Sequence, residues 1–292
     1  MVMQQLSDRT NALLEWFRQR DHRGISEEGR TKLLVHGEVR PVATVLFHGM
    51  SASPEQFVRF AHELHERGHN VVVPRLPRHG HRNRLTTAPA GLRADDLRML
   101  AAESVELAQG LGEHVIVAGF SLGGLLAVWI AEQYPVDRAI AIAPFLGMSW
   151  MPSRWTVPFT DLVLKLPNFF GWWDLLLRER QQPEHGYPRY SSHAVGESLL
   201  LAREVLARAN EAFAARELVL VTNTRETAVN NRAIARLAAL ARASHGATSF
   251  EEVLLRGIPL SHDIIEPSRH PEIADRVFPE LLDLLTRPFG GD

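Results

Sequence analysis

The sequence predicts an α/β fold, with a mostly parallel central sheet, helices on both faces and one inserted segment. Three observations predict this class. Short β-branched and apolar runs, such as residues 42–47 and 115–118, alternate with longer stretches of helical apolar spacing. The chain has 292 residues, 45% of them hydrophobic, which is enough for one large core. Between residues 146 and 216 the alternation stops, and four of the six tryptophans fall in this stretch.

The spacing of apolar residues predicts the helices and strands along the chain. An amphipathic helix is expected first, over residues 6–20, because its apolar side chains recur at helical spacing. After it, β-branched runs bounded by turn residues favour strands, and an apolar period near 3.6 favours helices. The expected strands cover residues 33–35, 42–47, 71–73, 115–118, 139–143, 218–221 and 253–255, and the expected helices cover residues 55–67, 95–111, 122–134, 230–243 and 271–286.

This order divides the chain into three parts. Residues 1–30 form an N-terminal helix and lead-in, residues 31–145 and 217–292 form the α/β core, and residues 146–216 form an inserted cap subdomain. The division rests on the abrupt change in composition after the strand at residues 139–143. No internal repeat period is visible.

A serine stands between two glycines in Gly119-Phe120-Ser121-Leu122-Gly123, where an expected strand meets an expected helix. A tight strand-to-helix turn forces its central residue into strained dihedral angles, and neighbours without a Cβ let the backbone fold back closely. The helix that follows directs its N-terminal amides at the same point, which suits a negatively charged oxygen. Ser121 is therefore a candidate nucleophile, and an ordinary Gly/Ser turn is the alternative interpretation.

A serine nucleophile requires a histidine base. His262 lies in Ser261-His262-Asp263, after the last expected strand and a Gly257/Pro259 turn, which is where a loop would present a base. His245 is the nearest competitor, and its place beside Gly246 in a polar loop predicts a solvated side chain.

The base in turn requires a carboxylate that orients it. Glu226 follows the expected strand that ends at Thr222, and it is the only carboxylate before the next helix. Asp263 is adjacent to His262 in sequence, so we expect its side chain to point elsewhere. No carboxylate follows the strand at residues 139–143. Glu226 is therefore the expected orienting acid, and a solvated loop charge is the alternative.

The third requirement is a pair of amides for an oxyanion. The buried-strand run at residues 42–47 ends in His48-Gly49-Met50-Ser51 before a helix. The amides of Met50 and Leu122 are the expected donors. The place of His48 before Gly49 predicts a structural histidine that hydrogen-bonds the backbone and shapes the turn.

Four segments together resemble the α/β-hydrolase superfamily, in particular bacterial carboxylesterases, monoacylglycerol lipases and lysophospholipases. They are residues 48–57, Val73-Pro74-Arg75-Leu76-Pro77-Arg78-His79-Gly80-His81, residues 119–124 and Ser261-His262-Asp263. The resemblance spans about residues 31–285. It implies an α/β-hydrolase fold with a triad of Ser121, Glu226 and His262. Glu226 departs from the aspartate that most relatives carry at the acid position.

The resemblance implies a serine hydrolase that cleaves carboxylic esters of short- to medium-chain acyl or monoacylglycerol type through an acyl-enzyme, without a cofactor. Amide, thioester or carbon–carbon bond hydrolysis on the same triad remains an alternative. A catalytically silent binding protein of the same fold is the alternative from another class. Dehalogenase and epoxide hydrolase chemistry is disfavoured because it needs an aspartate in place of Ser121.

Large aromatic rings crowd the inserted segment, and five of them are candidate substrate-binding residues. A subdomain needs a core of its own, but buried aromatic area also binds acyl chains well. Adhesion to a lipid surface is a third interpretation, which the absence of a basic amphipathic face disfavours. The candidates are Trp150, Trp155, Phe159, Trp172 and Trp173.

The composition excludes several partners. A formal net charge of −2 gives no electrostatic case for nucleic acid, and no apolar run is long enough for stable membrane insertion. The chain has no cysteine, so disulfides give no indication of its compartment. Residues 1–21 are too polar for a signal peptide, so a cytoplasmic location is expected. His62 and His65, like His79 and His81, lack a third ligand at suitable spacing, so no metal is expected. A homodimer is an assembly that the sequence allows.

Overall fold

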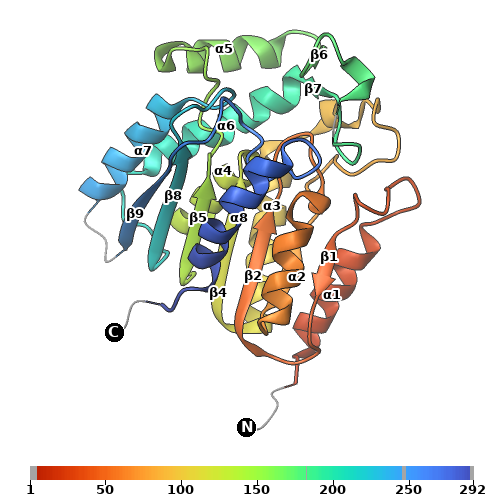
Figure 1. Ribbon diagram of the computed structural model, residues 1–292, viewed down its shortest axis with the longest axis vertical. Helices are drawn as coiled ribbons and strands as arrows, with labels where there is room; N and C mark the ends of the chain where they lie inside the picture. Colours follow the sequence, from red (N-terminus) through yellow and green to blue (C-terminus); the bar gives the residue numbers. More distant parts are fainter. Residues whose placement is uncertain (1–4, 182, 245–247, 290–292) are drawn as a thin grey trace.

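The computed structural model describes residues 5–181, 183–244 and 248–289, and a seven-stranded sheet lies at its centre (Figure 1). The strand order is β1-β3-β2-β4-β5-β8-β9; β1 pairs antiparallel with β3, and every other pair is parallel. The bounds are β1 Lys32–Leu34, β2 Arg40–Phe47, β3 Asn70–Val73, β4 Gly112–Phe120, β5 Arg138–Ile142, β8 Glu217–Asn223 and β9 Ser249–Leu255. The predicted α/β class with a mostly parallel sheet is confirmed.

Helices cover both faces of this sheet. In Figure 1, α2 and α8 lie in front of the strands, and the rings of Phe60 and Phe278 join them with centroids 4.5 Å apart. Behind the sheet, α3 contacts α1 and α4, and α6 contacts both α3 and α4. The helices are α1 Asp8–Gln19, α2 Val58–Glu66, α3 Ala94–Leu111, α4 Leu122–Gln133, α5 Ser153–Lys165, α6 Ser192–Arg208, α7 Asn231–Ala243 and α8 Pro271–Thr286, with short 3-10 helices η1 Pro54–Phe57, η2 Ala88–Gly91 and η3 Arg178–Arg180.

The core is continuous through the sheet. Strands β3 and β5 are buried along their whole length, as expected for parallel strands that are covered on both faces. Helix α4 is apolar all round and almost wholly buried, because it lies between the sheet and α6. One cluster of buried apolar side chains therefore extends from α1 to α8.

The chain between β5 and β8 leaves the sheet and carries α5, a short antiparallel pair and α6. The pair consists of β6 Phe170–Trp172 and β7 Arg189–Ser191, and Figure 1 shows it with α5 at the top of the molecule. Because β4 and β5 are parallel neighbours, this segment starts at the same edge of the sheet where β4 meets α4. Its last helix, α6, packs on α3 and α4 and contributes Leu199, Leu201 and Val205 to the main core.

The structure differs from the expected elements in several places, of which these are examples. The helix expected at residues 55–67 begins as the 3-10 turn η1 before α2. β9 is longer than its apolar residues indicate, because Arg287 and Arg242 pair with Glu251 and Glu252 on this edge strand. The short strands β6 and β7 were not expected.

Candidate active site

Ser121 occupies a strained turn between β4 and α4. Its dihedral angles are φ 56° and ψ −110°, a conformation that L-residues rarely adopt. Its amide donates to the Ile142 carbonyl at 2.9 Å, and its carbonyl accepts from the Phe145 amide at 3.0 Å, so the turn is held from β5. A Cβ on Gly119 would lie 2.1 Å from the Gly123 carbonyl oxygen, so this turn requires glycine there.

The side chains of Ser121, His262 and Glu226 form a chain of two hydrogen bonds. His262 Nε2 lies 2.9 Å from Ser121 Oγ, and His262 Nδ1 lies 2.8 Å from Glu226 Oε1. A carboxylate oxygen can only accept, so Nδ1 carries the proton and Nε2 is left to accept from the serine hydroxyl. The three groups come from the turn after β4, the loop after β8 and the loop after β9. The competitor His245 lies outside the described residues.

The Glu226 carboxylate is buried and fixed, with 1% of its side chain exposed. Its Oε1 also accepts from the amides of Ala228 at 2.7 Å and Val229 at 3.3 Å. Burial opposes ionisation, but the hydrogen bond and charge of His262 and the two amides outweigh it, so the pKa of Glu226 is lowered. Its Oε2 has no hydrogen-bond partner among the described residues. This carboxylate is therefore ionised and held in contact with the imidazole.

The same pairing raises the pKa of His262 above its ordinary value of 6.5. Burial favours the neutral ring, but the Glu226 hydrogen bond and charge, with a smaller contribution from Asp263, favour the imidazolium more. Asp263 itself pairs with Arg269, so its side chain is engaged away from the triad, as expected. The ring is basic enough to accept a proton from a hydroxyl.

Two hydrogen bonds to the Gly49 carbonyl orient the peptide between Gly49 and Met50. Gly49 O accepts from His48 Nδ1 at 2.9 Å and from the Ala52 amide at 3.2 Å. His48 Nε2 accepts from the Leu76 amide at 3.1 Å, which places the ring proton on Nδ1. In a planar trans peptide, C=O and N–H point in opposite directions, so these bonds turn the Met50 N–H away from the carbonyl's donors. His48 thus hydrogen-bonds the backbone and shapes the turn, as expected.

The other amides of the 48–53 loop have acceptors. The Gly49 amide donates to Gln56 Oε1 at 2.9 Å, and the Ser51 amide donates to His79 Nε2 at 3.1 Å. By contrast, the Met50 amide has no acceptor among the described residues. Gln56 and His79 are functional candidates that the sequence analysis missed, because no local pattern shows which distant amide a buried side chain accepts from.

This loop lies directly against the turn that holds Ser121. A Cβ on Gly123 would stand 1.9 Å from the Phe47 carbonyl oxygen, at the end of β2. The Leu122 amide is in the first turn of α4, where N–H groups have no intrahelical partner, and it has no acceptor among the described residues. The N–H groups of Met50 and Leu122 thus both lack an acceptor among the described residues; Leu122 directly follows Ser121, and Met50 stands on the loop that packs against this turn.

His79, one of the two histidines that flank Gly80, is buried. Its Nδ1 donates to the Pro77 carbonyl at 2.8 Å, which leaves Nε2 free to accept from the Ser51 amide. Burial lowers the pKa of His79 to about 4, so the ring stays a neutral acceptor at physiological pH.

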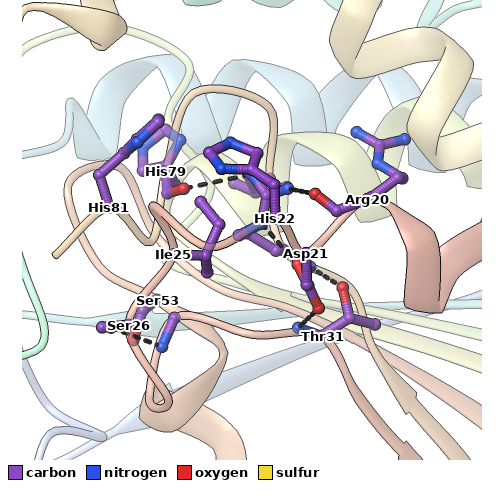
Figure 2. A network of polar contacts seen from close by, with 12 residues as sticks. Arg20, Asp21, His22, Ile25, Ser26, Thr31, Ser53, His79 and His81 are labelled. Carbon is purple, nitrogen blue, oxygen red and sulfur yellow. Dashed lines mark hydrogen bonds and ion pairs between the residues drawn. The ribbon is translucent and has the colours of Figure 1, made fainter.

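A buried ion pair holds the chain that carries His79. Arg75 Nε donates to Asp21 at 2.8 Å, and its other nitrogens donate to the carbonyls of Arg20 and His79. The second Asp21 oxygen accepts from the Thr31 amide at 2.8 Å (Figure 2). The N-terminal lead-in is thereby joined to the loop that supports the 48–53 loop.

The five aromatic candidates of the inserted segment lie in two places. Trp150, Trp155 and Phe159 line a groove of about 340 Å³ on the outer side of α5, and none of the triad residues lines it. Trp150 is 70% exposed and Trp155 56%. Trp172 is in β6, and the Trp173 ring lies 4.7 Å from that of Tyr190, centroid to centroid.

No group of three or more His, Asp or Glu side chains in the described part of the chain is arranged to hold a metal ion. No described helix combines the length and the apolar character that crossing a membrane requires.

The chain belongs to the alpha/beta hydrolase family, whose model matches residues 44–283. Lipase 1 of Psychrobacter immobilis is 28% identical over 102 residues, a match that covers 35% of this chain and less than a third (31%) of that lipase.

Solved structures share the fold at low sequence identity. A structure from a study of the metagenome-derived lipolytic enzymes LipS and LipT has a TM-score of 0.64 at 17% identity. The match covers 88% of this chain and 98% of that chain. The monoacylglycerol lipase of Paleococcus ferrophilus has a TM-score of 0.63 at 18% identity, covering 83% and 93%. A monoglyceride lipase variant from Saccharomyces cerevisiae has a TM-score of 0.63 at 13% identity, covering 87% and 89%.

Proposed function

We propose that this protein is a serine hydrolase that cleaves carboxylic esters through an acyl-enzyme. The observation that carries the proposal is the unbroken contact from Glu226 through His262 to Ser121, at a strained turn near two amides that have no acceptor among the described residues. A hydroxyl, a base and an orienting acid in this order are what acyl transfer needs.

In the proposed reaction, Ser121 Oγ attacks the ester carbonyl carbon while His262 Nε2 takes the hydroxyl proton. Glu226 stabilises the imidazolium that results. The Met50 and Leu122 amides donate to the oxyanion of the tetrahedral intermediate. His262 then gives its proton to the leaving alkoxide. Water next attacks the acyl carbon while His262 takes a proton from it, and the ring returns this proton to Ser121 Oγ as the acyl–oxygen bond breaks and the carboxylic acid leaves.

We propose esters with an apolar part as substrates, of short- to medium-chain acyl or monoacylglycerol type. The similarity to enzymes named as lipases and monoacylglycerol lipases supports this class. The segment at residues 146–216 acts in this proposal as a cap, and its aromatic side chains supply part of the apolar wall. A cytoplasmic location and a homodimer stay predictions.

A panel of p-nitrophenyl esters of increasing acyl length tests the proposal. We expect turnover that depends on chain length, with covalent labelling of one serine by a fluorophosphonate. Matched p-nitroanilide and thioester substrates test the alternatives that use the same triad. An absence of both turnover and labelling would favour a silent binding protein of this fold.

The pH dependence follows from the raised pKa of His262. The ring must be neutral to accept the proton, so kcat/KM should fall as the pH drops through a value above 6.5. Glu226→Gln removes the charge that favours the imidazolium but leaves the ring buried, so the acid limb of the residual activity should move to lower pH. Profiles of kcat/KM against pH check this, and an acid limb at the same pH in both proteins would contradict it.

Chelators are expected to leave ester turnover unchanged. In the proposed reaction two amides stabilise the oxyanion, and Ser121 is activated by His262 rather than by a bound ion. Incubation with EDTA, followed by the p-nitrophenyl assay, measures this. Loss of activity that zinc restores would contradict the prediction and would direct attention to His79 and His81.

A further inference from the structure

A second group of serine, histidine and glutamate side chains joins three loops beside the candidate site. Ser53 Oγ lies 2.9 Å from His185 Nδ1, and His185 Nε2 lies 3.1 Å from Glu266 Oε2. Ser53 belongs to the 48–53 loop, and Glu266 stands four residues after His262 on the loop that presents the base. His185 comes from the inserted segment. These three side chains, Ser53, His185 and Glu266, which we call the relay, therefore connect the loop of the candidate oxyanion amide, the loop of the base and the inserted segment.

This group is not a second nucleophilic centre, because Ser53 has no exposed surface. A carbonyl carbon could not reach its oxygen. The Ser53 hydroxyl also donates to the Glu28 carbonyl at 3.2 Å, so its proton has an acceptor within the protein. The order of side chains repeats that of the triad, but the burial assigns it a different role.

Glu266 is fixed through Oε1, while its Oε2 faces His185 Nε2 at 3.1 Å and has no hydrogen-bond partner among the described residues. Its side chain is 3% exposed, and Oε1 accepts from the Ser268 amide at 3.2 Å and the Ser268 hydroxyl at 2.7 Å. Burial opposes its ionisation, but His185 and Ser268 outweigh this effect and lower its pKa. A buried carboxylate that is hydrogen-bonded within its own loop and faces a histidine of the inserted segment keeps these two segments beside each other.

The chain after His185 continues the contact along the 48–53 loop. The Tyr187 amide donates to the Ser51 carbonyl at 2.6 Å, and Ser51 Oγ lies 3.5 Å from the Arg189 carbonyl oxygen. We call residues 185–189 the strap. Ser51 has φ 63°, a strained value that persists only where the surroundings hold it. The strap therefore contacts both the carbonyl and the hydroxyl of Ser51, the residue that follows Met50.

We propose that His185 and Glu266 are positioning residues for the oxyanion hole, which fix the Met50 amide relative to His262. The inference rests on the proposed function. Base and amide must act on one tetrahedral centre, and misplacement by about 1 Å can cost about 100-fold in rate. Met50 and His262 stand on separate loops, and the relay is the side-chain connection that spans these loops.

A cavity of about 720 Å³ borders the relay, with His185, Glu266 and Gln56 in its lining. Gln56 is the acceptor for the Gly49 amide, so both supports of the loop face the same space. Side chains replaced here have room to relax without forcing the loops apart. The effects of such variants therefore report lost contacts.

The test uses His185→Leu and Glu266→Leu in the full-length protein. We expect each variant to lower kcat by about 10- to 100-fold with little change in KM, a loss below that of a whole oxyanion donor. The double variant should be no slower than the slower single variant, because the two residues act as a unit. Glu266→Gln keeps an acceptor and should be faster than Glu266→Leu; a rate no faster would overturn a role through hydrogen-bond geometry.

Arg98→Leu is the matched control, since Arg98 joins α3 to Glu204 of α6 at 2.5 Å and does not touch the 48–53 loop. It should lower Tm and leave kcat unchanged. Relay variants that lower Tm and keep the wild-type kcat would overturn the proposal.

The rate at which a fluorophosphonate labels Ser121 gives a second readout, because it needs the same amides but no known substrate. It should fall by the same factor as kcat. If the wild-type protein is labelled but cleaves no ester, only the proposed substrate class fails. If both relay variants are labelled as fast as the wild-type protein, the positioning role is overturned.

Discussion

Ser121→Ala is expected to lower ester turnover by about 10⁶-fold and to abolish fluorophosphonate labelling. The hydroxyl oxygen is the atom that forms the acyl bond in the proposed reaction, and His262 Nε2 lies 2.9 Å from it. Alanine has a Cβ as serine does, so the substitution adds no new backbone strain to this turn and the variant should stay folded. Assays with p-nitrophenyl esters, gel-based labelling and Tm together measure the effect.

Ser198→Ala is the matched control for this loss. Ser198 is fully buried, its hydroxyl donates to the Ala194 carbonyl within α6, and no histidine among the described residues is hydrogen-bonded to it. Turnover and labelling should be those of the wild type. If labelling survived in Ser121→Ala, another residue would be the nucleophile and the proposed function would fail.

Local sequence patterns predicted the parts of this molecule that local forces determine. The glycines beside Ser121 are needed because the turn brings backbone atoms within van der Waals contact, and such crowding is visible in five consecutive residues. Helix α8 has the predicted bounds, since Pro271 begins it and its apolar spacing runs to Thr286. Glu226 could be found by elimination, as the only carboxylate in its loop.

Contacts between distant segments were beyond such patterns. Ser53 and His185 are 132 positions apart, and His79 and Ser51 are 28 apart. Nothing around any of these residues in sequence indicates its partner, because the pairing exists only once the sheet brings their loops to one edge. The sequence pattern predicted too short a range for the charged edge strand β9 for a similar reason, since Arg287 pairs with Glu251 from 36 positions away.

Composition alone also did not locate the aromatic rings of the inserted segment. A dense run of tryptophans is compatible with a buried wall or with an exposed face, and only packing decides between them. Leu176 is 94% exposed, and Trp150, Trp155 and Leu162 line the groove on the outer side of α5. Phe159 lines the same groove, but unlike these exposed side chains it is half-buried and packs against the core.

Glu226→Gln is expected to lower kcat by about 10⁴-fold while the protein stays folded. The amide oxygen can accept from Ala228, Val229 and His262 as Oε1 does, and its nitrogen would replace Oε2, which has no partner among the described residues. The shape is kept, but the charge that stabilises the imidazolium is lost. Glu226→Asp keeps the charge with shorter reach and should retain more activity. Steady-state kinetics of the three proteins compare these effects.

Glu132→Gln is the matched control, because it replaces another buried glutamate by its amide. Burial, with the nearby charge of Glu204, raises the pKa of Glu132 to about 9, so this carboxyl is already neutral at pH 7 and its amide changes no charge. Its activity should equal that of the wild type. The difference between the two variants then measures the charge at His262, and wild-type kcat in Glu226→Gln would mean that the imidazolium forms without the help of this carboxylate.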